Sequence, residues 1–386
     1  MCKRIVVIGG SASGIYFSLL LKRKHPEYDI LLLEKEAKVG KKLLATGNGH
    51  CNCLNANLDK ECFNNSSWIE KYIKKYPVSK LNEFLTSLGI LVHFNEEGLG
   101  YPVSNSAASF VNILCSNLKK EGIRVLINAK FLDYNKDEII YEHEGKTIKT
   151  SYDYLVFAAG GKSGKNLGSD GYCLDLVKRK GIDVKPLLPV LCPIKTFEQA
   201  PELDGCRLKA NVRAFVDNKP VFCEDGEVLF KKDGLSGMVI FNLSRILVRE
   251  NKRAEIFIYP KFLEEKIDGF SGTSSIDKVT NYESLFEPKI AGFLSKITAK
   301  PTYLHEKSLF NSHNCSFKFT YKSNYDFIDS HVSSGGVEIS EMEDDLKLKK
   351  DHSVILLGEI IDIDGKCGGY NLSWTLISAM AAVENL

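Results

Sequence analysis

The chain has 386 residues, of which 44% are hydrophobic, 26% charged and 10% aromatic. This composition excludes disordered and fibrous proteins, and the length is typical of two or three globular domains. Lys and Arg number 51 against 49 Asp and Glu, so the net charge of +2 gives no overall field that would attract nucleic acid or an anionic membrane. We therefore expect a small-molecule substrate, and neither nucleic acid nor a membrane as a partner.

The eleven cysteines follow no metal-binding or disulfide pattern. Their number is odd and no Cys-x-x-Cys pair occurs, which argues against a zinc site and against a secreted disulfide framework. The apolar run from Ile5 to Leu21 imitates a signal peptide, but the glycines and serines of residues 9–14 interrupt it. We expect a cytoplasmic protein with a mature N-terminus, reduced thiols and no metal.

The first elements of the chain form a βαβ unit. Residues 5–8 are apolar and β-branched, as in a strand buried on both faces, and residues 12–24 are predicted to form a helix. Residues 29–33 form a second apolar run of strand length. Two strands joined by a helix in this way lie parallel, so a mainly parallel sheet is expected.

The remaining elements divide into two kinds. A loop rich in Gly and Asn is expected over 40–57, and further elements are predicted as helices over 67–75, 79–88 and 107–120 and as strands over 125–128, 139–143, 146–150 and 154–158. From about residue 187, clustered prolines and an alternating run at 211–216 indicate a β-rich, barrel-like domain with a small helical part over about 262–300. The buried-strand pattern returns at 353–357, before a helix that begins near Gly369.

The turn between the first strand and the first helix carries a nucleotide-binding pattern. Gly9 and Gly14 occupy the first and third positions of the Gly-x-Gly-x-x-Gly fingerprint, and Ser11 stands at the second, just before Ala12 at the start of the helix. Backbone N–H groups at such a helix N-terminus face a pyrophosphate. Glu34, at the end of the second strand, supplies the carboxylate that accepts hydrogen bonds from an adenosine ribose. The pattern predicts an adenine dinucleotide; an ordinary glycine-rich connection is the alternative.

The loop after Glu34 favours FAD over a nicotinamide dinucleotide, because an NAD-dependent dehydrogenase would continue with regular βαβ units. In this loop and in later blocks, the sequence resembles the BaiN-like, or aminoacetone-oxidase-like, family of FAD-dependent oxidoreductases. The blocks that carry the resemblance are residues 40–44, 46–52, 101–104, 158–163, 168–172, 234–237, 334–337 and 358–372.

The resemblance implies a set of FAD-contacting residues beyond the glycine turn. Glu359 would lie near the ribityl hydroxyls, and the helix from Gly369 would direct its N–H groups at the flavin edge that becomes negative on reduction. The further cofactor residues that it implies are Lys35, Lys42, Thr46, Gly47, Asn48, Cys51, Asn52, Ala159, Gly160, Gly161, Gly358, Tyr370, Asn371 and Leu372.

The sequence departs from the family at two places that bear on its substrate chemistry. His50 stands where the family usually has Arg, and Lys231-Lys232-Asp233 replace a common Thr-His-aromatic run. The candidates for a catalytic group are His50 and Cys51. A redox disulfide between Cys51 and Cys53 is disfavoured, because one intervening residue would strain the ring and no second glycine fingerprint for NAD(P)H is found.

We predict an α/β fold with a Rossmann-like FAD-binding domain formed by residues 1–186 and 333–386. Residues 187–332 form an inserted β-rich substrate or cap domain. The expected function is an FAD-dependent oxidoreductase that transfers a hydride between the flavin and either a small organic substrate or NAD(P)H. The alternatives are an NAD-dependent dehydrogenase and a flavin-binding protein without turnover. The acidic run at 362–365 is interpreted as part of the flavin-binding block over 358–372, with a solvated loop or a calcium-site fragment as alternatives.

Overall fold

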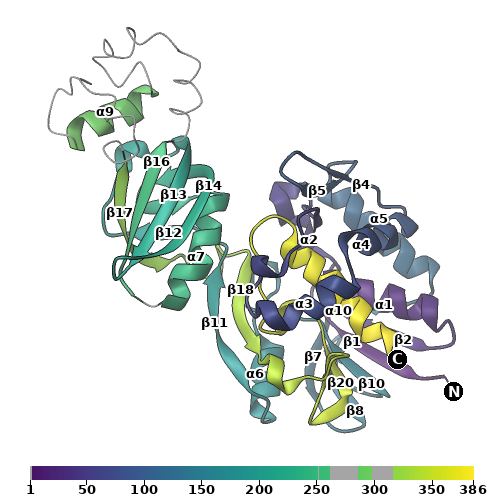
Figure 1. Ribbon diagram of the computed structural model, residues 1–386. Coiled ribbons are helices and arrows are strands. Elements are labelled where there is room, and N and C mark those ends of the chain that lie inside the picture. The colour runs from purple at the N-terminus through teal and green to yellow at the C-terminus, as the bar shows by residue number, and fades with distance from the viewer. Residues whose placement is uncertain (1, 251, 261–285, 298–315) are drawn as a thin grey trace. The chain divides into compact units, whose positions relative to one another are not determined.

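The computed structural model describes residues 2–250, 252–260, 286–297 and 316–386. They divide into two compact units, Met1–Leu188 with His331–Leu386, and Pro189–Ser330, which can be followed by colour in Figure 1. The first unit therefore combines the two ends of the chain, and the second is inserted between them.

A six-stranded sheet with the order β19-β20-β10-β1-β2-β6 forms the centre of the first unit. Its strands are β1 (Arg4–Ile8), β2 (Asp29–Leu33), β6 (Arg124–Leu126), β10 (Tyr154–Phe157), β19 (Lys347–Leu348) and β20 (Asp351–Leu356). Five strands run parallel, and the edge strand β19 runs antiparallel to β20. The chain passes from β1 to β2 on one side and later to β10 on the other, so a topological switch point lies between β1 and β10.

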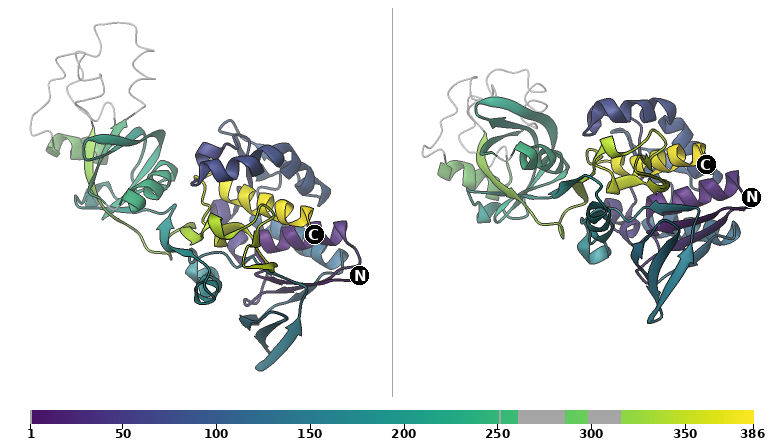
Figure 2. Two further views of the ribbon diagram at one scale, coloured as in Figure 1. Left: turned by 60° about the horizontal axis from the view of Figure 1, so that its bottom comes forward. Right: turned by 90° about the horizontal axis from the view of Figure 1, so that it is seen from below.

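Helices α1 (Ala12–Lys24) and α10 (Tyr370–Glu384) lie side by side against this sheet (Figure 2). Both are apolar on more than one side, which is the pattern of a helix covered from several directions. Phe17 and Ile377 are accordingly 0% exposed. The Lys24 Nζ donates to the carbonyl oxygens of Val383 (2.9 Å) and Glu384 (2.6 Å), which ties the last turns of the two helices together. The predicted helix over 12–24 is confirmed to the residue.

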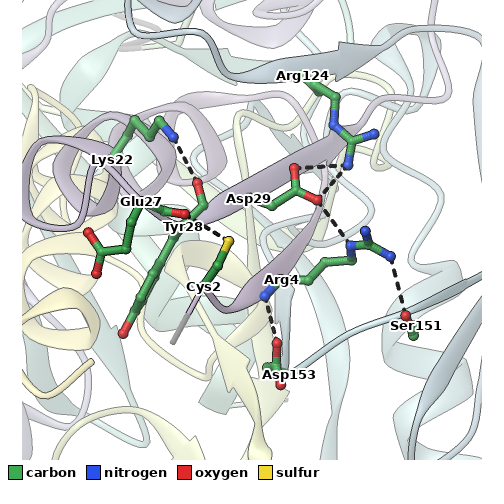
Figure 3. Close-up of polar contacts among 9 residues, drawn as sticks. All are labelled: Cys2, Arg4, Lys22, Glu27, Tyr28, Asp29, Arg124, Ser151 and Asp153. Atoms are coloured by element: carbon green, nitrogen blue, oxygen red, sulfur yellow. Dashed lines mark hydrogen bonds and ion pairs between the residues drawn. The ribbon is translucent and has the colours of Figure 1, made fainter.

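Polar contacts hold the amino ends of the strands together (Figure 3). The Asp29 carboxylate on β2 accepts from Arg4 Nε on β1 (3.0 Å) and from Arg124 NH2 on β6 (2.8 Å). The backbone N–H of Arg4 donates to the Asp153 carboxylate just before β10 (2.6 Å). These contacts lie at the edge of the sheet opposite to the carboxyl ends of the parallel strands.

The other elements of the first unit surround the sheet. Its remaining helices are α2 (Lys41–Leu44), α3 (Ser66–Lys75), α4 (Val78–Ser87), α5 (Ala107–Lys120) and α6 (Tyr172–Arg179). Its other strands are β3 (Leu54–Asn55), β4 (Val92–Phe94), β5 (Leu99–Pro102), β7 (Ala129–Tyr134), β8 (Glu138–His143), β9 (Lys146–Ser151), β11 (Val184–Val190) and β18 (Val332–Val337). The predicted hairpin is confirmed as β8 and β9, with Glu144 and Gly145 at φ values of 51° and 72° in its turn.

The second unit is a closed barrel of six strands in the order β12-β15-β14-β13-β16-β17, which confirms the barrel-like prediction. The strands are β12 (Ile194–Thr196), β13 (Arg207–Val216), β14 (Lys219–Lys231), β15 (Gly234–Ser236), β16 (Ala254–Pro260) and β17 (Phe317–Asn324). The α-helices among the described residues of this unit are α7 (Met238–Glu250) and α9 (Pro288–Ile297). Of the predicted helical part, α9 is described, while residues 262–285 and 298–300 lie outside the described residues. None of the described helices has the length and apolar character that crossing a membrane requires.

The acidic run at 362–365 is buried, so a solvated loop does not describe it. Among the described residues no further acidic side chain joins Asp362 and Asp364 in a group that could hold a calcium ion. Asp362 is 3% exposed and accepts from Lys185 Nζ (2.7 Å), Asn64 Nδ2 (3.0 Å) and Asn65 Nδ2 (3.2 Å). The side-chain oxygen of Asn64 also accepts from the backbone N–H of Asp364 (2.7 Å). This network joins the start of α3 and strand β11 to the segment that precedes α10.

We expect Asp362→Ala to lower the free energy of unfolding by about 1.5–3 kcal/mol, because it removes the charge-assisted hydrogen bonds from Lys185, Asn64 and Asn65. The two Asn amides keep the backbone carbonyl of residue 362 as an acceptor. Urea unfolding followed by circular dichroism measures the change. The control is Asp344→Ala, since Asp344 is paired with Lys71 at the surface with its side chain 89% exposed. A loss of stability at Asp362 no greater than at Asp344 would contradict the structural role of the network.

Candidate functional site

The carboxyl ends of four neighbouring parallel strands bring together most of the residues predicted from the sequence. In the sheet order, β20 leads into Gly358 and Glu359, β10 into Ala159–Gly161, β1 into Gly9–Gly14, and β2 into Glu34. Ligands of open α/β sheets bind at this edge, beside the switch point. All these residues belong to the first unit.

The glycines of the first turn are required by close backbone contacts. Gly9 has a φ of 109°, and a Cβ atom there would lie 2.6 Å from the carbonyl oxygen of Ala158. A Cβ atom at Gly14 would lie 2.0 Å from the carbonyl oxygen of Gly9. Any side chain at either position would push α1 away from β1, so the fingerprint glycines have a direct steric reason.

The N-terminus of α1 fits the pyrophosphate of a dinucleotide. Ser11 is the N-cap residue in an extended conformation, and among the described residues no side chain caps this helix. The first turn contains no acidic residue. The first N–H groups of a helix have no partner within it. The backbone N–H groups of Ala12 and Ser13 can therefore donate to an anion. Ser11 stands in place of the second glycine of the fingerprint, and its hydroxyl makes no capping hydrogen bond to the N–H groups of α1.

Glu34 is held directly beside the glycine turn. Its Oε2 accepts from the backbone N–H of Gly10 (2.9 Å), and its Oε1 accepts from the N–H of Glu36 (2.8 Å). Burial raises the pKa of this carboxyl, while the two backbone N–H groups act in the opposite direction. The side chain of Lys35 is directed at Asp170 and not at the glycine turn, since its Nζ pairs with the Asp170 carboxylate (2.5 Å).

Lys42 and Glu359, which are far apart in the sequence, form an ion pair of 2.8 Å. The other Glu359 oxygen accepts from the backbone N–H of Ser333 (2.9 Å), whose hydroxyl accepts in turn from the N–H groups of Lys162 (2.9 Å) and Ser163 (3.0 Å). A Cβ atom at Gly161 would lie 2.5 Å from the Ser333 hydroxyl. Ser333 was not predicted; its only signal in the sequence is its place directly before the Ser-Gly-Gly-Val block.

The helix predicted near Gly369 begins there, with Gly369 as its N-cap at a φ of 88°. A Cβ atom at Gly369 would lie 2.1 Å from the carbonyl oxygen of Leu54, so the backbone approaches β3 closely. The Asn371 side chain binds back to Gly365, accepting from its N–H (2.8 Å) and donating to its carbonyl (3.0 Å). Tyr370 packs edge-on against Phe63, with ring centroids 6.0 Å apart. These two side chains fix the turn, and Leu372 packs against the hydrophobic core.

The loop of residues 46–52 adds backbone in unusual conformations. Gly47 and Asn48 have φ values of 56° and 53°, and the Thr46 hydroxyl donates to the carbonyl of Leu43 (2.7 Å). The side chain of Asn52 lies beside Gly369, where an added Cβ atom would be 2.8 Å from the end of its amide. The loop is therefore placed at the N-terminus of α10.

The two candidate catalytic residues differ in exposure. The His50 ring is exposed, and its Nδ1 lies 3.0 Å from the carbonyl oxygen of Asn105, which requires this nitrogen to carry the proton. Cys51 and Cys53 are buried free thiols, and burial raises the pKa of Cys51 to about 11. Burial also raises the pKa of Cys53 strongly. Both thiols are protonated near neutral pH, which suits packing rather than nucleophilic chemistry. Among the described residues, no group of three or more His, Cys, Asp or Glu side chains could hold a metal.

The fold and site combine a glycine turn, a carboxylate on the next strand and an uncapped helix N-terminus at one edge of a Rossmann sheet. These are the features of a dinucleotide-binding α/β protein. The chain belongs to the HI0933-like family, since the family description "HI0933-like protein Rossmann domain" matches residues 3–385. It is an FAD-dependent oxidoreductase, as the resemblance implied.

Relatives and solved structures match over nearly the whole chain. A 3-dehydro-bile acid delta(4,6)-reductase of Clostridium scindens is 27% identical over 396 residues, covering 96% of each chain. A ribosomal RNA dihydrouridine synthase of Escherichia coli is 23% identical and covers 99% of this chain and 97% of the relative. A 3-ketosteroid delta1-dehydrogenase structure from Sterolibacterium denitrificans has a TM-score of 0.53 at 10% identity, covering 99% of this chain and 98% of that one, and shows the shared fold.

Substitutions at Ser11 test the placement of the pyrophosphate. We expect Ser11→Gly to retain FAD and Ser11→Asp to give folded protein that is largely free of flavin, because a carboxylate adds like charge and bulk beside two phosphates. The ratio of flavin to protein absorbance measures occupancy, and far-ultraviolet circular dichroism checks folding. Full occupancy in Ser11→Asp would place the pyrophosphate elsewhere.

Cys53→Ser tests the role of the buried thiols. We expect flavin reduction and turnover to stay within about tenfold of the wild type, since a protonated, buried thiol contributes packing and no electron transfer. Stopped-flow measurement of flavin reduction gives the rate. A larger loss in a variant that still binds FAD and keeps its stability would revive a dithiol mechanism.

Proposed function

We propose that the residues at the carboxyl edge of the sheet bind FAD, and that the protein reduces a carbon–carbon double bond of a small organic substrate with NAD(P)H as electron donor. The observation that carries the proposal is the convergence of the α1 N-terminus, Glu34 and the Lys42–Glu359 pair on one edge. When bound, FAD supplies the two-electron chemistry that passes a hydride from donor to substrate.

Each part of this edge has a task in holding the cofactor. The N–H groups after Ser11 bind the pyrophosphate, and the Glu34 carboxylate accepts from the adenosine ribose. Lys42 and Glu359 present one donor and one acceptor group to the ribityl chain, with Gly160, whose Cβ position is open, leaving space for it. The N-terminus of α10 and Lys42 favour the negative charge that a reduced flavin carries.

The relatives suggest the substrate chemistry. The Clostridium scindens relative is named as a delta(4,6)-reductase of a 3-dehydro bile acid. A double bond next to a carbonyl accepts a hydride readily, because the carbonyl withdraws electrons from the receiving carbon. The second hydrogen arrives as a proton, and His50 is the group that we assign to move it, because Nε2 of its exposed ring is the nitrogen that faces away from Asn105.

An RNA uridine is the second candidate substrate. The Escherichia coli relative is named as a ribosomal RNA dihydrouridine synthase, and it aligns with 99% of this chain. We expect no nucleic-acid partner only because the net charge is close to zero. No observation on the structure tests this expectation, so it stays a prediction. The two candidates share the reduction of a carbon–carbon double bond and differ in the size and charge of the substrate.

The test begins with the purified holoenzyme under anaerobic conditions. We expect NADH or NADPH to bleach the flavin absorbance, and a 3-oxo-4-ene steroid to restore it if the small-substrate proposal is right. Restoration by an unmodified ribosomal RNA fragment, and not by the steroid, would favour the RNA candidate. Failure of both pyridine nucleotides to reduce the flavin would contradict NAD(P)H as donor.

Glu34→Ala tests the ribose assignment directly. We expect it to retain less FAD, because the ribose hydroxyls lose their acceptor. Flavin fluorescence released by heating measures the cofactor that each preparation holds, and Glu36→Ala is the control, since the backbone rather than the side chain of Glu36 contacts Glu34. Equal retention by Glu34→Ala and the wild type would show that the ribose lies elsewhere.

A further inference from the structure

The outer face of the barrel in the second unit carries both aromatic and cationic side chains. Along β16, Ile256 and Ile258 are 0% exposed and point inward, so Phe257 and Tyr259 point outward. Paired residues of antiparallel strands share a face, and Phe257 is paired with Arg213 on β13 and with Lys318 on β17. The outer surfaces of these three neighbouring strands are therefore continuous.

The aromatic rings on this face form a connected series. Phe257 lies edge-on to Phe215 with ring centroids 5.7 Å apart, and it stacks with Tyr259 at 6.4 Å. Cations lie over the same rings: Arg213 is 5.0 Å from the Tyr259 centroid and Lys318 is 5.4 Å from that of Phe257. Rings and positive charges thus alternate across the three strands.

Phe197, which follows β12, extends this face beyond β17. Its backbone N–H donates to the carbonyl of Thr320 (3.0 Å), which places it next to that strand. Its ring is 61% exposed, and Arg253 and Lys322 lie 5.9 Å and 6.0 Å from its centroid. We call the eight residues the aromatic–basic face; they are Phe197, Arg213, Phe215, Arg253, Phe257, Tyr259, Lys318 and Lys322.

A hollow adjoins the exposed end of this face. It has a volume of about 660 Å³, and Phe197, Arg253 and Lys322 line it together with Leu247 and Val248 on α7. Pockets of roughly 300–1,000 Å³ hold small molecules or single groups of larger ones. The hollow is therefore large enough for a flat ring beside Phe197, with Arg253 and Lys322 in its lining.

The charge of the face is positive on balance. Its cations are accompanied by two carboxylates, of which Glu255 pairs with Lys318 (2.6 Å) and Glu198 is bound by the N–H and hydroxyl of Thr320 (2.5 and 2.7 Å). Burial acts to raise the pKa of Glu198, but the hydrogen bonds from Thr320 and the charge of Arg253 lower it. Of the three remaining cations, Arg253 therefore interacts with a carboxylate. Within the described part of the chain, Lys322 belongs to none of the ion pairs.

We infer that the aromatic–basic face binds single-stranded RNA. Proteins bind single strands by stacking bases on aromatic rings while cations contact the phosphates, and this face supplies both kinds of group in alternation. An acidic peptide would use the cations but not the rings, and a duplex does not expose its bases for stacking. The inference deepens the second candidate under the proposed function, and it concerns binding rather than the chemistry at the flavin.

The test uses the full-length holoenzyme and a fluorescein-labelled oligouridylate of 12 nucleotides, with binding measured by anisotropy. We expect a Kd below about 100 µM at 50 mM salt and weaker binding at 200 mM. Phe197→Ala should weaken binding by about tenfold, as expected for the loss of one stacked base. Arg253→Ala with Lys322→Ala should weaken it further and lower the slope of log Kd against log salt by about 1.4, since each phosphate contact contributes about 0.7.

Leu91→Ala is the matched control, because Leu91 is an apolar residue of the first unit with a similar exposure of 59%. It should bind the oligonucleotide like the wild type. Absence of binding by the wild type overturns the inference, and so does a loss confined to the charge variants with Phe197→Ala unaffected, because stacking would then be absent. Flavin content and reduction by NADH are measured on the same samples. Intact flavin chemistry without RNA binding therefore defeats this inference alone, and RNA binding without flavin chemistry defeats only the proposed function.

Discussion

The close approach of backbone at the β1–α1 turn is the constraint on which the rest of the first unit depends. The turn is packed so tightly against Ala158 and against its own first residue that side chains at Gly9 and Gly14 have no space. This packing fixes the direction in which α1 leaves the sheet. Glu34 is then set by its bond to the N–H of Gly10, and Gly358 lies close to Ser13 on α1. The lack of space for side chains at Gly9 and Gly14 thus positions residues that follow β1, β2 and β20.

The sequence predicts those parts of the fold whose signals are local. An apolar strand, a glycine turn and a helix within the first 24 residues are specified by neighbours in the chain, and the structure reproduces them to within a residue. Helix α7 was not predicted, because its apolar residues lie in a stretch whose prolines and alternating runs indicate strands. Local sequence patterns predict isolated helices and strands well. They predict poorly where helices and strands alternate over short distances in the chain.

The long-range part of the site could not be predicted in the same way. Glu359 was assigned to the cofactor from a motif, but its bonds to Lys42 and Ser333 join segments that only the folded chain brings together. Asn371 shows the opposite case: it stands in the strongest motif, and its side chain serves the turn rather than pointing freely to a ligand. The net charge of +2 likewise averages over a surface on which positive groups are concentrated locally.

The split of the first unit between the two ends of the chain has a consequence for synthesis. Strand β20 and helix α10 leave the ribosome after the barrel, and until they arrive β10 is an unprotected sheet edge and α1 lacks the helix that covers it. The barrel between them is complete earlier, since all its described strands precede residue 325. A nascent chain therefore has the whole barrel sequence available while its sheet is unfinished, and exposed strand edges of this kind favour aggregation and chaperone binding.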